Sequence, residues 1–354
     1  MRAAIDTNGL YTTQAGVARY IRGVLRGLRA LPEPPDFFEF AWEVENFDYR
    51  QPQRAMKTFY RELIWGPHLA NAKLRRLKAD LVHATGAILY RPEAGIHHVV
   101  TLHDLAVLRQ PGRFRKWQVA SARRQFKLLE RAEKIICISQ FTAGEAMALL
   151  QLPAKKLVVV HNGCDFQEST PVEKAPEEAA PSEFFLFVGS LEPGKNLNLL
   201  QEVYRLARVR GAALPPLLIV GSRWEGVPGE GAPPADWHYL GRQPDETLVY
   251  LYRRAQALLF PSQYEGFGLP VAEAMSLGCP VICSRVASLA EVGGEAVLYA
   301  GPNAHSYLEA MLRLLEDDNQ RSRMIELGRA QSARFNWTKC ARETVEVYKS
   351  VCGS

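Results

Sequence analysis

The amino-acid sequence predicts an α/β protein with two doubly wound parallel sheets, one in each of two domains. The chain has 354 residues, of which 47% are hydrophobic and 23% charged, a soluble composition long enough for two separate cores. Short runs rich in valine and isoleucine alternate with longer amphipathic stretches, as in parallel strands joined by helices. This alternation stops near the middle of the chain and then starts again, which indicates a second domain.

The N-terminal domain is predicted to span residues 1–165. Its strands are expected where short apolar runs lie between polar turns, at residues 2–6, 80–85, 97–104, 134–139 and 156–163. Its helices are expected near residues 15–31, 115–132 and 140–150. Doubly wound sheets of this kind bind ligands beyond the carboxyl ends of their strands.

Residues 166–183 are predicted to be a linker, because their prolines, alanines and acidic residues offer little to a core. The C-terminal domain then spans residues 184–336. Its strands are expected at residues 184–190, 216–222, 237–241, 257–262, 280–284 and 296–300, and its helices near 195–210, 244–255, 270–278, 303–316 and 318–334. The last segment, residues 337–354, is predicted to be a helix that packs on either domain, including by crossing back to the first.

The charge is unevenly distributed along the chain. Residues 1–170 hold 25 Lys and Arg against 16 Asp and Glu, whereas the remainder holds 18 against 22. The basic excess of the first half fits either a solvated helix face or attraction to an anionic membrane surface or acidic acceptor. A nucleic-acid partner is not expected, because no binding motif accompanies the charge.

The cysteines and the apolar runs point to a cytoplasmic protein. The six cysteines include no CxxC pair, which favours small buried thiols in a reducing compartment over a metal or redox site. No apolar run has the length of a membrane span, and the first residues lack the apolar core of a signal peptide. We therefore expect a cytoplasmic location and leave open peripheral contact at the inner membrane face.

The stretch "PSQYEGFGLPVAEAMSLGCPVI", residues 261–282, is the main candidate site. It is predicted to be a strand end, a glycine turn and a helix that begins near Pro270, so that the amides of Gly266, Phe267, Gly268 and Leu269 can bind a phosphate. Since a carboxylate repels phosphate, Glu265 and Glu273 are interpreted as acceptors for sugar hydroxyls on either side of a diphosphate. The alternative is a surface acid and an acid favoured by the helix dipole.

Two further candidate groups follow predicted strands. Lys195, in "GSLEPGKN", follows the first strand of the second domain and could offset charge on a leaving diphosphate; the alternative is an exposed lysine at a helix start. His103 and Asp104 end the strand at residues 97–104. A histidine at such a strand end is either part of a site or a structural hydrogen-bonding group.

The motif "YEGFGLPVAEAMSLGCPVI" resembles the Glu-x7-Glu motif of glycosyltransferase family 4. The resemblance covers nearly the whole chain, including "GVARYIRGVLRGL", "VVTLHDL", "ICISQFTAGEA", "VVVHNGCD" and "FVGSLEPGKNLNLL". It implies the GT-B fold, two Rossmann-like domains facing each other across a cleft, and a retaining mechanism. "TLHDL" and "SLEPGKNL" resemble bacterial mannosyltransferases in particular.

The resemblance also implies roles for single residues. His103 and Asp104 would lie near the donor sugar, Glu265 would hold its hydroxyls, and Glu273 would hold the ribose. Gly16 would let a helix start approach the diphosphate, although Ala15 stands where the family commonly has a second glycine. Gln243, with Arg242, would lie near the base. Ser190 and Gly194 occupy the two places where the family often has an arginine, so the charge clamp around Lys195 would be weaker or completed elsewhere.

Several reaction classes lack their motifs in this chain. There is no GxGxxG after the first strand, no GxxxxGK[ST] and no DxD, which disfavours dinucleotide oxidoreductases, P-loop phosphotransferases and metal-dependent glycosyltransferases. We expect a hexosyltransferase with no cofactor or metal, acting on a glycan or lipid-linked acceptor in polysaccharide biosynthesis. GDP-mannose is the favoured donor, and a UDP-sugar is the alternative donor. A non-catalytic sugar-nucleotide-binding protein and a GT-B epimerase would fit the same fold.

Overall fold

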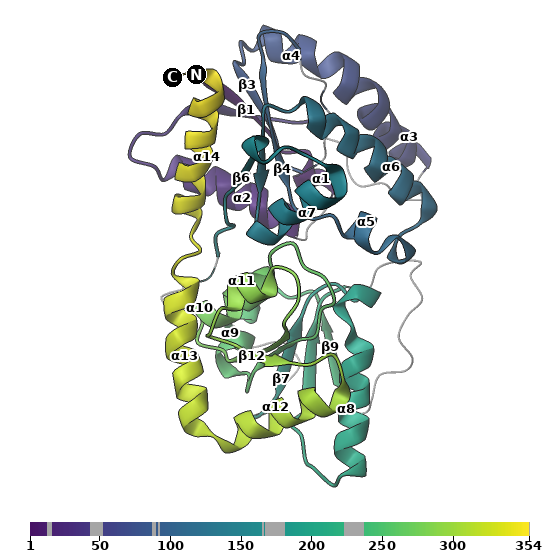
Figure 1. Cartoon of the computed structure of the whole chain (residues 1–354), viewed down its shortest axis with the longest axis vertical. Helices are drawn as coiled ribbons and strands as arrows, with labels where there is room; N and C mark the ends of the chain where they lie inside the picture. The colour runs from purple at the N-terminus through teal and green to yellow at the C-terminus, as the bar shows by residue number, and fades with distance from the viewer. Residues whose placement is uncertain are drawn as a thin grey trace. The chain divides into compact units, whose positions relative to one another are not determined.

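Two compact units make up the chain (Figure 1). The computed structural model describes residues 1–12, 16–42, 52–86, 90, 93–164, 166, 181–222 and 237–353. Unit 1 is formed by Met1–Gly163 together with Asn336–Ser354, and unit 2 is the continuous stretch Cys164–Phe335. Most of the predicted linker, residues 167–180, lies outside the described residues.

A six-stranded parallel sheet forms the centre of unit 1, in the order β2-β1-β3-β4-β5-β6. The apolar runs that predict its strands are buried, except at the edge strand β6 where they are partly buried, as expected for a parallel sheet covered on both faces. The strands are β1 (Arg2–Asp6), β2 (Asp36–Phe40), β3 (Leu81–Ala84), β4 (His97–Leu102), β5 (Lys134–Cys137) and β6 (Leu157–Val159).

The helical segments of unit 1 are more numerous than predicted. The structure adds the edge strand β2, whose "DFFEF" follows a proline-rich turn, and a helical stretch from residue 52 to 76. The segments are α1 (Gly9–Thr12), α2 (Gly16–Arg29), α3 (Pro52–Tyr60), the π-helical η1 (Arg61–Leu69), α4 (Ala70–Arg76), α5 (Ala106–Arg109), η2 (Pro111–Arg113), α6 (Lys116–Phe126), η3 (Lys127–Arg131), α7 (Gln140–Leu150), η4 (Ala154–Lys156) and α14 (Trp337–Cys352).

The last helix, α14, packs against α2 within unit 1. Glycines on α2 allow this close approach: a Cβ atom on Gly23 would lie 2.1 Å from the indole of Trp337, and one on Gly27 would lie 2.3 Å from the Trp337 carbonyl oxygen. The side chain of Asn336 caps the start of α14 by accepting a hydrogen bond from the Lys339 amide. Residues 336–354 thus complete the core of the unit in which the chain began.

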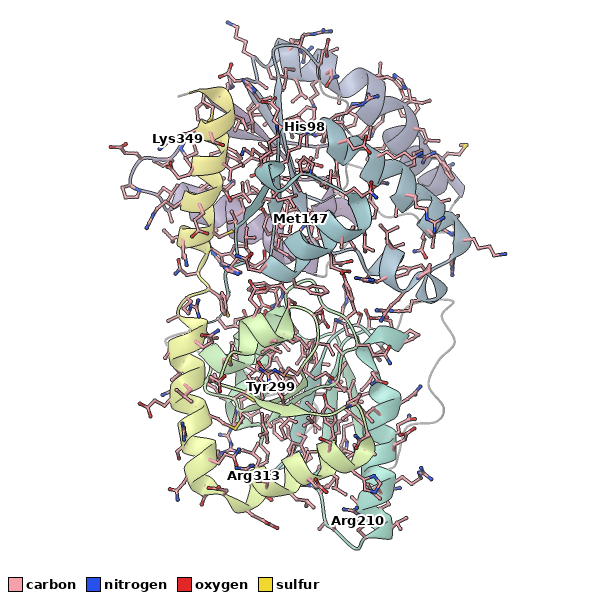
Figure 2. All side chains as sticks on the ribbon, in the orientation of Figure 1. His98, Met147, Arg210, Tyr299, Arg313 and Lys349 are labelled. Atoms are coloured by element: carbon pink, nitrogen blue, oxygen red, sulfur yellow. The ribbon has the colours of Figure 1, made fainter. Side chains whose placement is uncertain are left out.

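Buried histidines lie in the middle of unit 1. His83 on β3 bridges Tyr348 Oη on α14 and Thr101 Oγ1 on β4, each at 2.7 Å. His98 on β4 is also buried (Figure 2), and its ring nitrogens have no hydrogen-bond partner among the described residues. Burial lowers the pKa of His83 to about 3 and that of His98 to about 4, so both rings are neutral at physiological pH.

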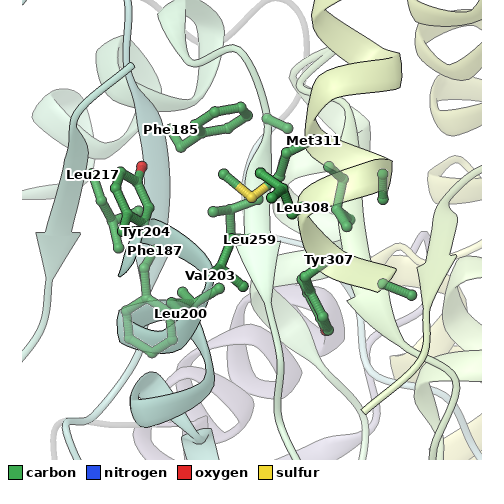
Figure 3. Packing of buried hydrophobic residues seen from close by; sticks show 14 of the residues in the cluster. Phe185, Phe187, Leu200, Val203, Tyr204, Leu217, Leu259, Tyr307, Leu308 and Met311 are labelled. Carbon is green, nitrogen blue, oxygen red and sulfur yellow. The ribbon is translucent and has the colours of Figure 1, made fainter. Parts of the chain in front are cut away.

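Unit 2 repeats the architecture with six parallel strands in the order β12-β11-β10-β7-β8-β9. Phe185, Phe187 and Leu259 from the central strands pack against residues of α8 and α12, which cover one face of the sheet (Figure 3). The strands are β7 (Phe185–Val188), β8 (Leu217–Val220), β9 (Trp237–Gly241), β10 (Leu258–Phe260), β11 (Val281–Ser284) and β12 (Leu298–Ala300). The predicted second parallel sheet is therefore confirmed.

The helices of unit 2 follow the predicted alternation with the strands. Asn303 and Asp317 cap two of them, each side chain accepting a hydrogen bond from an amide of the first turn. A short helix that was not predicted, α11, follows β11. The segments are η5 (Pro193–Lys195), α8 (Leu197–Val209), α9 (Asp245–Arg254), α10 (Leu269–Ser276), α11 (Leu289–Gly293), α12 (Ala304–Glu316) and α13 (Asp318–Ser332).

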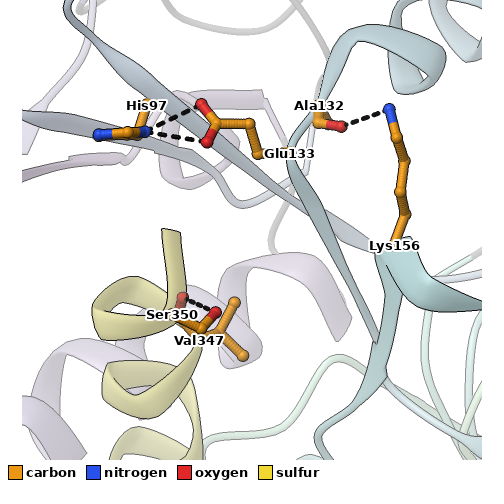
Figure 4. A network of polar contacts seen from close by, with 6 residues as sticks. All are labelled: His97, Ala132, Glu133, Lys156, Val347 and Ser350. Carbon is orange, nitrogen blue, oxygen red and sulfur yellow. Dashed lines mark hydrogen bonds and ion pairs between the residues drawn. The ribbon is translucent and has the colours of Figure 1, made fainter. Parts of the chain in front are cut away.

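Polar contacts hold the strand ends of unit 1 (Figure 4). His97, at the start of β4, lies 2.9 Å from the carboxylate of Glu133, which precedes β5. The ammonium group of Lys156 donates to the Ala132 carbonyl oxygen at 2.9 Å. These contacts join segments at the amino ends of β4 and β5, opposite the carboxyl edge where a ligand is expected.

The cysteines are small core residues, as predicted. All six are free, and all except the partly buried Cys352 are buried. Burial raises the pKa of Cys279 to about 12, which keeps its thiol protonated and unreactive. Within the described part of the chain, no helix combines the length and apolar character that a membrane span needs.

Candidate active site

The candidate site in unit 2 is built on the neighbouring strands β7 and β10. Because the two strands are parallel, the loops that follow them start at the same edge of the sheet. The amide of Gln263, after β10, donates to the Gly194 carbonyl oxygen, after β7, at 2.9 Å. Sheet order thus brings together two sequence segments that are about seventy residues apart.

Lys195 and Glu265 form an ion pair at this edge. The Lys195 ammonium donates to Glu265 Oε1 at 2.5 Å, and the two side chains are 17% and 12% exposed. The same ammonium lies 5.4 Å from the centre of the Phe260 ring, in cation–π geometry. Lys195 is therefore a fixed, largely desolvated charge and not an exposed lysine at a helix start.

The loop after β7 is shaped by its own side chains. Glu192 is buried and accepts a hydrogen bond from the Gly194 amide at 2.8 Å, which caps η5. The next strand also contributes, since a Cβ atom on Gly221 would lie 1.7 Å from the Gly189 carbonyl oxygen. Ser190 lies between these contacts and is partly exposed. Neither Glu192 nor Gly221 was singled out from the sequence.

The glycine turn after β10 leads directly into α10. Gly268 has a φ of +98° and precedes the first helical residue, Leu269, and a Cβ atom on it would lie 2.6 Å from Leu289. Phe267 is buried and packs edge-on against Phe335 at 5.3 Å between ring centres. Because the Phe267 ring lies inside the protein, the turn presents its backbone at the positive end of α10. This backbone belongs to Gly266, Phe267 and Gly268.

The two acids of the motif are both held inside unit 2. Glu273 is 1% exposed, and one of its carboxylate oxygens accepts a hydrogen bond from Tyr252 Oη at 3.1 Å. The backbone carbonyl of Glu265 accepts a hydrogen bond from Ser288 Oγ at 2.9 Å. Ser288 follows a different strand, β11, and no local pattern in the sequence points to this contact.

Gln243 lies apart from the ion pair. It follows β9, the edge strand two positions from β7 in the sheet, and its side-chain amide donates to the Leu240 carbonyl oxygen at 2.5 Å. Gln243 lies at the same carboxyl edge of the sheet as Lys195, but at the outer end of that edge.

His103 and Asp104 follow β4 in unit 1. His103 Nε2 donates to the Thr85 carbonyl oxygen at 2.7 Å, so the second ring nitrogen, Nδ1, is the acceptor in the neutral ring. The ring packs edge-on against Tyr20, 4.9 Å between centres, and burial lowers the pKa of His103. Asp104 accepts a hydrogen bond from the Ala106 amide at 2.9 Å at the start of α5.

Gly16 is the first residue of α2, at the carboxyl side of β1. It is exposed, and a Cβ atom on it would meet nothing within 4 Å. Ala15, which precedes it, lies outside the described residues. In the described part of the chain, no three His, Cys, Asp or Glu side chains gather closely enough to hold a metal ion.

Two family models match the chain, one on each half. "Glycosyltransferase Family 4" matches residues 15–168 and "Glycosyl transferases group 1" matches residues 169–331. O-antigen chain mannosyltransferase B of Escherichia coli is 35% identical over 292 residues, which cover 78% of this chain and 76% of the relative. The chain belongs to glycosyltransferase family 4. It is accordingly a glycosyltransferase, and the sequence-based resemblance is confirmed.

A second relative and two solved structures are also similar to this chain over most of its length. The D-inositol 3-phosphate glycosyltransferase of Corynebacterium urealyticum is 27% identical over 323 residues, covering 81% of this chain and 75% of the relative. The crystal structure of Anabaena HepE with UDP-glucose has a TM-score of 0.70 at 17% identity over 99% of this chain and 100% of that one. Sucrose-phosphate synthase from Thermosynechococcus elongatus has the same TM-score at 18% identity over 99% and 98%. The fold of this family 4 chain is GT-B.

Proposed function

We propose that this chain is a retaining, metal-independent mannosyltransferase that uses GDP-mannose and extends a glycan in polysaccharide biosynthesis. The observation that carries the proposal is the Lys195–Glu265 pair, 2.5 Å apart beside the start of α10. The similarity to an O-antigen chain mannosyltransferase supports mannose as the sugar. The acceptor is accordingly a hydroxyl of a glycan, free or lipid-linked.

The Lys195–Glu265 pair can contact both groups that the breaking bond joins, the diphosphate and the sugar. An ammonium has three N–H donors, and Glu265 occupies one of them, which leaves donors for phosphate oxygens. Amides of the turn from Gly266 to Leu269 and the positive end of α10 supply further stabilisation of the growing negative charge. The carboxylate of Glu265 accepts from hydroxyls of the sugar, and that of Glu273 accepts from the ribose.

The reaction then needs no nucleophile from the protein. The bond between the sugar and the diphosphate breaks, both bonding electrons leave with the diphosphate, and the acceptor hydroxyl attacks the same face of the sugar. The proton of the acceptor hydroxyl passes to the departing phosphate oxygen. Neutral His103, with Nδ1 as its acceptor nitrogen, would receive a hydrogen bond from a hydroxyl of the donor sugar.

Nucleotide binding tests the donor most directly. A ligand at 100 times its dissociation constant stabilises the folded state by about 2.7 kcal/mol, which thermal unfolding detects. We expect GDP to raise the melting temperature more than UDP. A larger shift with UDP would replace the mannose assignment by a UDP-sugar, a donor class supported by the UDP-glucose bound in the HepE structure.

Product analysis tests the reaction itself. Incubation with GDP-mannose and a mannose-terminated oligosaccharide is expected to release GDP and give an α-linked product, with the same rate in the presence of a metal chelator. A β-linked product would contradict the retaining mechanism. Nucleotide binding without any transfer would favour a non-catalytic binding protein, and conversion of the donor without acceptor would favour an epimerase.

A further inference from the structure

A chain of hydrogen bonds runs through the core of unit 1 between two tyrosine hydroxyl groups. Tyr20 Oη on α2 lies 2.8 Å from Thr101 Oγ1 on β4, and Thr101 Oγ1 lies 2.7 Å from His83 Nε2 on β3. His83 Nδ1 in turn lies 2.7 Å from Tyr348 Oη on α14. All four side chains belong to residues that are at most 1% exposed, so water does not compete for these bonds.

His83 joins the two halves of this chain. Its pKa of about 3 means that the ring is neutral, so one ring nitrogen donates a hydrogen bond and the other accepts one. Both nitrogens have a partner, and the ring also packs edge-on against Tyr348 at 5.5 Å between centres. The ring therefore has a fixed orientation, because turning it over would leave buried polar atoms unpaired.

The other end of the chain reaches a residue of the proposed transfer reaction. The Tyr20 ring packs edge-on against the His103 ring, 4.9 Å between centres at an interplanar angle of 86°. Trp337, the first residue of α14, lies 6.1 Å from the same Tyr20 ring. The hydrogen bond from His103 Nε2 to the Thr85 carbonyl oxygen leaves the ring free to rotate about that bond. The contact with Tyr20 is a second restraint, which sets the plane of the His103 ring.

We propose that this hydrogen-bonded chain positions His103: it holds the Tyr20 ring in place, and that ring fixes the direction of the acceptor nitrogen Nδ1. Buried polar networks in which every member is bonded hold their side chains in one arrangement. Tyr20 and Tyr348 are the positioning residues at the two ends. The inference rests on the proposed function, in which Nδ1 receives a hydrogen bond from a hydroxyl of the donor sugar. Helix α14 thereby acts on a sugar contact through Tyr348.

NMR of isotopically labelled histidine in the full chain tests the positioning without any donor. The parent should show His103 in one neutral form with its proton on Nε2, assigned by the loss of its signals in His103→Gln. Tyr20→Phe and Tyr348→Phe each keep a ring and remove a hydroxyl, and both should broaden or split the His103 signals. Tyr204→Phe, which removes a buried hydroxyl that donates to the Pro215 carbonyl oxygen in unit 2, is the matched control and should leave them unchanged.

Donor affinity gives the functional measurement. Dissociation constants for GDP-mannose and for GDP separate the sugar contact from nucleotide binding. Tyr20→Phe and Tyr348→Phe should each weaken GDP-mannose about three- to tenfold, as expected for one net hydrogen bond, and leave GDP unchanged. The double variant should lose no more than Tyr20→Phe alone, because Tyr348 acts on His103 only through Tyr20. Thr101→Val should match Tyr20→Phe, and Thr101→Ser, which keeps the hydroxyl, should recover the parent affinity.

Three outcomes would overturn the proposal. They are unchanged His103 signals in both tyrosine variants, equal weakening of GDP and GDP-mannose, and a double variant whose loss is the product of the two single losses. Altered His103 signals without any change in GDP-mannose affinity would refute the donor contact in the proposed function and support positioning by Tyr20. If the parent binds neither GDP nor GDP-mannose, the donor assignment is wrong, and the ring signals alone decide the positioning.

Discussion

Lys195 and Glu265 are seventy residues apart in the chain and meet because β7 and β10 are neighbours in the sheet. Each side chain was predicted from its own motif, but their contact was not. Sequence spacing does not show which of several parallel strands lie next to each other. The ion pair means that Glu265 both orients the ammonium and lowers the cost of burying it.

Lys195→Ala should reduce turnover by about 100- to 1000-fold, as expected when one preorganised charge-stabilising contact is removed from such a site. The measurement is the rate of nucleotide release in the presence of donor and acceptor. Lys155→Ala, at an exposed lysine in unit 1, is the control and should retain the parent rate. A Lys195→Ala enzyme that is folded and within a few-fold of the parent rate would contradict the assigned role.

The residues of the site were predictable where local chemistry requires them. Gly268 is an example, because its positive φ before α10 is what the motif demands. Ser288 and Glu192 were missed, since their hydrogen bonds serve the backbone of a loop that the sequence alone does not place. The roles of His103, Glu265 and Glu273 toward a donor remain predictions.

At the scale of elements, the turn between β11 and α11 is strained. Ala287 has a φ of +51°, a left-handed conformation that costs roughly 1–2 kcal/mol for a residue with a Cβ atom. Its neighbour Ser288 is held by the hydrogen bond to Glu265, and Leu289 lies against Gly268. The strain is therefore located beside the glycine turn of the candidate site.

Ala287→Gly should raise the free energy of unfolding by about 0.5–1 kcal/mol, because glycine adopts this φ freely and its larger unfolded-state entropy offsets only part of the gain. Urea unfolding measures the change. The comparison variant is Ala154→Gly, at an exposed alanine outside the positive-φ region, which should be destabilised. Equal destabilisation of the two variants would show that Ala287 is not strained.

The contact between α2 and α14 gives a second prediction at this scale. Gly27→Ala should destabilise the protein by about 1–3 kcal/mol, since the new Cβ atom would lie 2.3 Å from the Trp337 carbonyl oxygen. Gly144→Ala on α7 makes the same change where nothing lies within 4 Å, and should stabilise by up to about 1 kcal/mol. If both variants shifted the urea midpoint alike, helix propensity and not packing would explain the result.

The elements with a clear apolar pattern were predicted well, and those without one were missed. The buried strands β7 and β10 follow from short apolar runs, whereas β2 lies at a sheet edge and only its last residue, Phe40, is buried. The helical stretch from residue 52 to 76 was missed because its apolar residues occupy two faces and show no single stripe. The amphipathic pattern of α14 predicted a helix but did not show which of the two domains it packs against.

At the scale of the molecule, buried titratable groups set the response to acid. His83 and His98 have folded-state pKa values of about 3 and about 4, below the ordinary 6.5, so the unfolded chain binds more protons as the pH falls below that value. Asp6 acts in the opposite sense, because burial raises its pKa from 3.8 to about 6 and the folded chain binds its proton first. Burial also lowers the pKa of His103, so three histidines destabilise the folded state on acidification and Asp6 stabilises it.

The free energy of unfolding should fall by at least about 1.4 kcal/mol per pH unit between pH 6 and pH 4, corresponding to a net uptake of one proton or more on unfolding. Urea midpoints across this range measure the slope. His98→Leu removes one of the three histidines and should flatten the curve, whereas His305→Gln, at an exposed histidine, should not. A slope that His98→Leu leaves unchanged would show that this ring does not carry the effect.

Because the last residues of the chain pack in unit 1, where the chain begins, unit 1 can complete its fold only after unit 2 has been synthesised. Residues 164–335 are made as one uninterrupted block and can condense as soon as they leave the ribosome, whereas the portion translated earlier lacks Trp337 and Tyr348 until synthesis has passed them. The part made first is thus finished last. A nascent chain arrested before residue 336 would present Gly23, Gly27 and His83 without the helix that covers them, and chaperones would encounter it in that state.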